Sequence, residues 1–153
     1  MTSNNTIIDD RYFLELADRE STFSHDLSTR IGAVIVQGHG IVARGFNDIP
    51  HQVGDTPERR ERPAKYVWTE HAERAAIFNA AKYGNSLLGT TMYTQGIPCA
   101  DCARAVIMSG IARVVVWKKG TGLEETSRWT DSIQAGKTML EEAGVEIVGV
   151  ERG

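Results

Sequence analysis

Four residues in the middle of the chain have the types and spacing to bind a metal and to move a proton. His71 and Glu73 stand two positions apart, and Cys99 and Cys102 stand three positions apart, with 28 residues from His71 to Cys99. One imidazole and two thiolates give zinc three protein ligands, which leaves its fourth tetrahedral position open for water. Glu73 is placed to approach that water without being a ligand, and a carboxylate there can carry protons. The pattern predicts a catalytic zinc ion.

Both motifs stand where we predict a helix to begin, at His71 and at Pro98. Cys99 and Cys102, at positions i and i+3, then lie on one face of their helix. A helix start has free N–H groups and a partial positive charge, which favour thiolates over thiols. Thiolates are the form that zinc binds, so the placement of the motifs agrees with their chemistry.

Two plainer interpretations of the cysteines are less consistent with the rest of the chain. A thioredoxin-like redox pair has no need of a His-x-Glu motif. A structural zinc site needs a fourth ligand, and His25, His39 and His51 show no matching spacing. His-x-Glu followed by Pro-Cys-x-x-Cys is instead the signature of zinc-dependent nucleobase deaminases. We therefore expect a deaminase.

The elements that position these residues alternate between helices and strands. Helices are expected over 9–23, 71–83, 98–109 and 129–143, and strands over 31–36, 41–46, 91–94, 113–117 and 145–150. Strands that alternate with helices form parallel pairs with right-handed crossovers. The prediction is an α/β fold, a three-layer α/β/α sandwich around a mixed five-stranded sheet, formed by residues 1–153 as one domain.

Two segments carry further detail. In the first helix, Asp9 and Asp10 are expected to cap the start, and Tyr12, Phe13, Leu16 and Ala17 to face inward. Residues 47–69 contain three prolines and no apolar periodicity, so we expect a long irregular insert. Inserts of this length in compact domains are usually functional or disordered.

Composition restricts the partners and the location. The net charge of −3 argues against a nucleic-acid polymer as ligand, because binding a polyanion needs many Lys and Arg contacts. No stretch approaches the roughly 18 apolar residues of a membrane span, and no signal peptide is visible. With only two cysteines, both in the proposed site, a cytoplasmic location with reduced thiols is expected.

The chain resembles the deoxycytidylate (dCMP) deaminases of the cytidine deaminase superfamily over nearly its whole length. The similar segments are residues 31–36, 45–50, 65–73, 98–104 and 107–111. The zinc motif is common to the superfamily. The Gly-Phe-Asn-x-x-Pro segment at 45–50 and the long insert before His71 are similar to dCMP deaminases in particular.

The resemblance implies one catalytic zinc ion on the three ligands named above, with Glu73 as the proton carrier. Asn47 matches the asparagine that contacts the sugar, and the backbone of Ala72 matches the group that binds the base near its exocyclic amine. The implied reaction is the hydrolytic deamination of dCMP to dUMP and ammonia. Similar proteins form homo-oligomers, hexamers or dimers, and are often regulated by dCTP and dTTP.

One departure from the family bears on regulation. Asp48 stands where these proteins usually have glycine, and a carboxylate there would repel a triphosphate. We therefore expect activation by dCTP to be weak or absent. Some members bind a second zinc ion through residues of the insert, but only His51 is available here, and no second ion is predicted.

Three further substrate contacts are expected. Arg60 lies in a basic segment, residues 59–65, and a guanidinium binds phosphate through two hydrogen bonds. Thr29 lies just before the first strand, and Trp117 at the end of a strand has a ring that can stack on a base. Alternatives to dCMP remain open: a deaminase of a free base, a nucleoside or a modified pyrimidine, a tRNA adenosine deaminase, or an inactive relative that only binds nucleotides.

Overall fold

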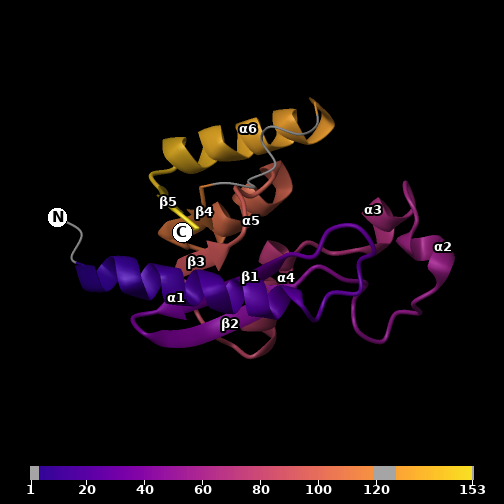
Figure 1. Cartoon of the computed structure of the whole chain (residues 1–153), viewed down its shortest axis with the longest axis horizontal. Helices are drawn as coiled ribbons and strands as arrows, with labels where there is room; N and C mark the ends of the chain where they lie inside the picture. The colour runs from indigo at the N-terminus through magenta and orange to yellow at the C-terminus, as the bar shows by residue number, and fades with distance from the viewer. Residues whose placement is uncertain (1–3, 119–126, 153) are drawn as a thin grey trace.

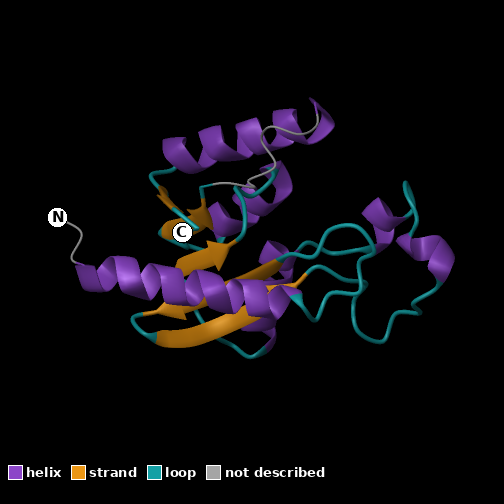
Figure 2. Cartoon of the chain, viewed as in Figure 1, coloured by secondary structure: helices purple, strands orange, loops and turns teal. Residues whose placement is uncertain are grey.

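The computed structural model describes residues 4–118 and 127–152, and these form a sheet with helices on both faces (Figures 1 and 2). The elements in chain order are α1 Asn4–Ser21, β1 Gly32–Gln37, β2 Gly40–Phe46, α2 Pro57–Arg60, α3 Lys65–Trp68, α4 Ala72–Lys82, β3 Thr91–Thr94, α5 Ala100–Met108, β4 Arg113–Trp117, α6 Ser127–Glu142 and β5 Glu146–Val150. None of the described helices is long and apolar enough to cross a lipid bilayer.

The sheet has the strand order β2-β1-β3-β4-β5 among the described residues. β1 runs antiparallel to both β2 and β3, whereas β3, β4 and β5 are mutually parallel. This arrangement confirms the predicted mixed five-stranded sheet. It also confirms that the helices between the parallel strands are crossover connections.

Alternating side chains divide the core into two clusters, because successive residues of a strand point to opposite faces. On one face, Ala33 and Ile35 of β1 and Val114 and Val116 of β4 pack under α4, α5 and α6. The other face packs against α1, and its buried residues are Phe13, Leu14, Ala17, Val34, Val36, Tyr93, Val115, Trp117 and Val150. The predicted metal ligands come from helices of the first face.

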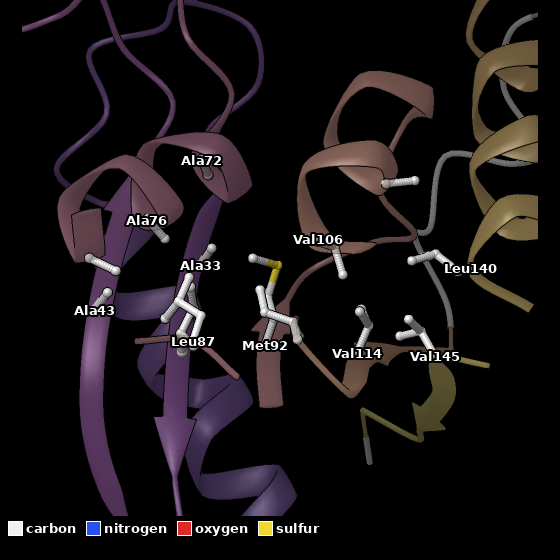
Figure 3. Close-up of a cluster of buried hydrophobic side chains, with 14 of the residues drawn as sticks. Ala33, Ala43, Ala72, Ala76, Leu87, Met92, Val106, Val114, Leu140 and Val145 are labelled. Atoms are coloured by element: carbon white, nitrogen blue, oxygen red, sulfur yellow. The ribbon is translucent and has the colours of Figure 1, made fainter. Parts of the chain in front are cut away.

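Small residues bring α4 close to the sheet. Figure 3 shows Ala72 and Ala76 of α4 next to Ala33 and Ala43 of the two antiparallel strands. A Cβ atom at Gly45 of β2 would lie 2.4 Å from the backbone nitrogen of Ala76, so only glycine permits this approach. The start of α4, where His71 stands, is thereby held firmly on the sheet.

The first helix differs from its prediction in two ways. It begins at Asn4, so Asp9 and Asp10 lie inside it and do not cap it. Asp10 is 3% exposed and accepts hydrogen bonds from Arg113 and from the Tyr93 hydroxyl, which explains a buried carboxylate in a helix. Tyr12 is 55% exposed and was wrongly placed inside; Leu14, fully buried, was missed.

The other helices match their predictions to within about two residues. The helix predicted from Pro98 begins at Ala100, so the proline precedes the first turn. The predicted irregular insert contains two one-turn helices, α2 and α3. Its ends are joined by an isolated antiparallel bridge between Asp48 and Glu70, whose backbones exchange two hydrogen bonds. The insert is thus a closed loop that returns to the residue before His71.

Candidate metal centre

Two helix starts bring the predicted ligands together. His71 is the N-cap residue of α4 and Cys99 the N-cap residue of α5, while Cys102 lies in the first turn of α5. The Nδ1 atom of His71 lies 3.5 Å from the Sγ atom of Cys99 and 3.5 Å from that of Cys102. In the described part of the chain, this is the group of His, Cys, Asp or Glu residues arranged to hold a metal ion.

The distances fit zinc. Bonds of about 2.3 Å to sulfur and about 2.0–2.1 Å to nitrogen, at the tetrahedral angle, separate the two atoms by about 3.6 Å. Both observed nitrogen–sulfur distances are 3.5 Å. The three ligand atoms lie within 4.8 Å of one another, so one ion can reach all three. Three ligands leave one zinc position for a reactant.

The site is largely buried and already has thiolate character. Cys99 is 7% exposed and Cys102 fully buried. Hydrogen bonds from Cys102 and then from His71 lower the pKa of the Cys99 thiol to about 4, against the opposing effect of burial. The hydrogen bond to Cys99 raises the pKa of Cys102, so the remaining proton stays on that sulfur. Zinc binding would displace this proton.

Glu73 is buried beside the cluster, in the first turn of α4. Burial raises the pKa of its carboxyl group above the ordinary value, and the charge of His71 opposes that rise. A raised pKa makes the carboxylate a stronger proton acceptor, and a carboxylate positioned in this way can accept and return a proton during a reaction. Ala72, the first residue of α4, has a backbone N–H in the open first turn, where no acceptor within the helix exists.

A chain of charged side chains crosses from one ligand helix to the other. The Glu70 carboxylate accepts hydrogen bonds from the backbone nitrogen of His71 at 2.8 Å and from Nε of Arg74 at 2.7 Å. The Arg74 guanidinium also lies 3.4 Å from the Asp101 carboxylate on α5. These residues were not predicted from the sequence, although the i and i+4 spacing of Glu70 and Arg74 indicates an ion pair along a helix.

Asn47 links the end of β2 to the loop before β1. Its side-chain amide donates to the Thr29 carbonyl and accepts from the backbone nitrogen of Ile31, both at 2.8 Å. Asn47 is next to Asp48, which is bridged to Glu70, the neighbour of His71. The bridge thus connects the neighbour of Asn47, the expected sugar contact, to the segment that leads into α4, and the amide of Asn47 holds Thr29.

Arg60 is already engaged by two carboxylates. Its guanidinium donates to Asp55 at 2.6 and 2.7 Å and to Asp48 at 2.6 Å, and the side chain is 9% exposed. This corrects the expectation that Arg60 offers a free guanidinium to a phosphate. The Arg60 guanidinium also balances the charge of the Asp48 carboxylate, so Asp48 would repel a triphosphate less than an unpaired carboxylate would.

Trp117 lies in the other core cluster. It is 1% exposed, packs against the α1 face of the sheet, and donates from Nε1 to Asp18 at 3.2 Å. The ligand helices α4 and α5 cover the opposite face. The expected stacking of Trp117 on a base is therefore corrected: strand alternation turns its ring away from the metal centre.

A buried ion pair between the insert and the loop before β1 was also missed. Nζ of Lys65 lies 3.2 Å from both carboxylate oxygens of Asp26 and 2.9 Å from Oγ of Ser28. Asp26 also accepts from the backbone nitrogens of Ser28 and Thr29. The pair fixes the loop before β1 to the insert, and no local sequence pattern connects two residues 39 positions apart.

Comparisons with known proteins agree with this geometry. Residues 7–118 match the family model of the cytidine and deoxycytidylate deaminase zinc-binding region. The chain is 37% identical over 135 residues to an uncharacterized deaminase in the luxG 3′ region of Aliivibrio fischeri, covering 88% of each chain. It is 33% identical over 149 residues to a probable deoxycytidylate deaminase of Drosophila melanogaster, covering 90% of this chain and 70% of that protein.

A solved structure has the same fold. The dCMP deaminase of cyanophage S-TIM5, in complex with dCMP and dUMP, superimposes with a TM-score of 0.73 at 22% identity, covering 98% of this chain and all of that one. The predictions of a zinc-binding protein and of a cytidine deaminase-like fold are confirmed by these matches. The chain belongs to the cytidine and deoxycytidylate deaminase zinc-binding family.

Proposed function

We propose that the protein catalyses the zinc-dependent hydrolytic deamination of a cytosine nucleotide, dCMP, to dUMP and ammonia. The observation that carries this proposal is the buried group formed by His71, Cys99 and Cys102 with Glu73 beside it. The relatives named deoxycytidylate deaminase support the choice of substrate. The proposed unit is one domain that spans the chain.

The reaction exchanges the amine on C4 of the base for the oxygen of water. Zinc held by the three ligands would lower the pKa of water at its open position to about 7 and so supply a nucleophile at neutral pH. Glu73 would take one proton from the water and give it to the ring nitrogen, and would then carry the proton of the new C4 hydroxyl to the amine, which leaves as ammonia. The backbone at Ala72 is the proposed contact to the base, and Asn47 with Thr29 the proposed contact to the sugar.

Two exposed arginines are the proposed contacts to the 5′-phosphate in place of Arg60. Nη2 of Arg62 lies 3.3 Å from Oγ of Ser28, one residue from Thr29. Arg30 follows Thr29, is exposed, and makes no ion pair with the described part of the chain. Replacing Arg30 or Arg62 with Ala should raise KM for dCMP and leave KM for deoxycytidine unchanged. Arg59→Ala is the matched control, because that guanidinium stacks on Trp68, 3.8 Å from the ring centre.

A deaminase of nucleosides or free bases is the second candidate, and one observation favours it: two aspartates already engage Arg60. Ammonia release should be measured over cytosine, deoxycytidine, dCMP, dCTP and the adenine and guanine counterparts. We expect the highest kcat/KM for dCMP. A higher kcat/KM for deoxycytidine or cytosine would replace our proposal with the second candidate.

We further propose a cytoplasmic homo-oligomer, a dimer or a hexamer. Reduced thiols at the metal centre support the location. Large apolar side chains left exposed on the single chain, including Phe78, Leu88 and Met108, support assembly. Light scattering after size exclusion would give the mass. A monomer at micromolar concentration would contradict the oligomer.

A further inference from the structure

The last helix, α6, reaches the metal centre through its backbone. A Cβ atom added to Gly136 would lie 2.4 Å from the carbonyl oxygen of Pro98 and 3.1 Å from the carbonyl carbon and oxygen of Cys99. Distances below about 3 Å are too short for such contacts, so only glycine lets α6 lie this close to the segment that carries the first thiolate. Figure 1 shows α6 running alongside α5.

One turn earlier on α6, Ser132 bonds to the same segment. The backbone nitrogen of Ala100, the first residue of α5, donates to Oγ of Ser132 at 3.0 Å. The first N–H groups of a helix have no acceptor within the helix, and the N-cap side chain serves only that of the second or third residue. The N-cap residue here is Cys99, which makes no side-chain cap hydrogen bond. Its sulfur lies beside His71, and Ser132 of the neighbouring helix satisfies the first N–H, that of Ala100.

The rest of this side of α6 is packed into the core. Ile133, Gly136 and Leu140 are all buried, and Leu140 approaches Val106 of α5, as Figure 3 shows. Gln134 and Thr138, on the other side of the helix, are exposed. The buried residues of α6 hold the helix in place, so Ser132 and Gly136 keep their contacts with Ala100 and with the Pro98–Cys99 segment.

We propose that Ser132 and Gly136 are positioning residues for the metal centre: together they fix the Cys99 thiolate at the distance from His71 and Cys102 that zinc requires. A well-formed zinc site has ligand distances within about 0.2 Å of their ordinary values. A Cβ atom on Gly136 must push the Pro98–Cys99 segment away, and loss of the Ser132 hydroxyl leaves the first N–H of α5 without its partner. The proposal rests on the three-ligand metal site of the proposed function, but not on the substrate.

The variants Gly136→Ala and Ser132→Ala test it, with Ser132→Thr as the conservative variant that keeps the hydroxyl. Gln134→Ala and Thr138→Ala are controls on the exposed side of the same helix. The rate of zinc release to a colorimetric chelator is measured for each. The absorption spectrum of the Co²⁺-loaded protein is recorded as well, because its visible bands report the ligand geometry.

We expect zinc release to be at least tenfold faster in Gly136→Ala and severalfold faster in Ser132→Ala, with changed Co²⁺ bands in both. Ser132→Thr and the controls should match the wild type. Alanine favours a helix more than glycine does. An effect on the stability of the α6 helix alone would therefore slow zinc release in Gly136→Ala, whereas the proposal predicts faster release.

If Gly136→Ala does not fold, the comparison of Ser132→Ala with Ser132→Thr decides. Release rates and Co²⁺ spectra unchanged in Ser132→Ala, or equally altered in Ser132→Thr, would overturn the proposal. A wild-type protein that binds neither Zn²⁺ nor Co²⁺ would instead overturn the metal site itself. The two failures are thus distinguishable, and neither readout depends on deaminase activity.

Discussion

Replacing Asp26 with Asn should destabilise the protein in a pH-dependent way. The Asp26 carboxylate is 5% exposed and pairs with the buried Lys65. Burial raises the pKa of Asp26, but hydrogen bonds from Thr29, Ser28 and Lys65 outweigh it and lower the pKa from 3.8 to about 2. A shift of that size corresponds to about 2 kcal/mol of folding free energy at pH 7. Leaving a fully buried charge unpaired costs about 3–5 kcal/mol. In the variant Lys65 still donates to Ser28, so we expect a loss of folding free energy nearer to about 2 kcal/mol.

The sign of the pH dependence follows from the lowered pKa. The stabilisation is complete above about pH 5, where Asp26 is ionised even in the unfolded chain, and it is lost as the pH falls toward 2. Urea unfolding of wild type and Asp26→Asn between pH 7 and pH 3 measures the difference. Glu151→Gln is the control, because Glu151 pairs with Lys118 at 3.5 Å on the surface and should contribute little. An Asp26→Asn effect at pH 7 no larger than that of the control would refute the reasoning.

Three other outcomes can be checked. Trp117→Phe should lower Tm, because it removes a hydrogen bond to Asp18 that contributes about 1 kcal/mol. KM for dCMP should stay unchanged. A raised KM would show that the Trp117 ring contacts the substrate. Asn47→Ala should cost about 1–3 kcal/mol in urea unfolding, because it removes two hydrogen bonds to backbone groups, and should also raise KM. Zinc removal by a chelator should abolish turnover and lower Tm, and re-addition of Zn²⁺ should restore both; turnover that persists in metal-free protein would contradict the family chemistry.

The parts of the fold and site that local patterns encode were predictable. The alternation of strands and helices along the chain predicted the mixed sheet, and the helix-start signals predicted that His71 and Cys99 stand at helix starts. Predictions failed where tertiary contacts override the local signal. Asp10 resembles a helix cap in sequence, but Arg113, about a hundred positions away, holds it inside the helix. The buried face of α1 carries Asp10, Phe13, Leu14 and Ala17, so Leu14 packs on the sheet and Tyr12 faces outward.

The substrate contacts were less predictable for the same reason. Arg60 stands in a basic segment, and only the folded insert shows that Asp48 and Asp55 engage its guanidinium. Trp117 ends β4, and the alternation of side chains along that strand places its ring on the α1 face, away from the metal ligands. Ser132 has no motif of its own; its contact with Ala100 arises from the packing of α6 on α5.

The most direct test of the account is Glu73→Gln, assayed for both zinc content and ammonia release from dCMP. Glu73 is buried beside the ligands without being one of them, so the variant should keep one zinc ion per chain. Its kcat should fall by about 10²–10⁴-fold, the usual contribution of a positioned proton carrier. Turnover within tenfold of the wild type, or loss of zinc from the variant, would contradict the role of Glu73 proposed here.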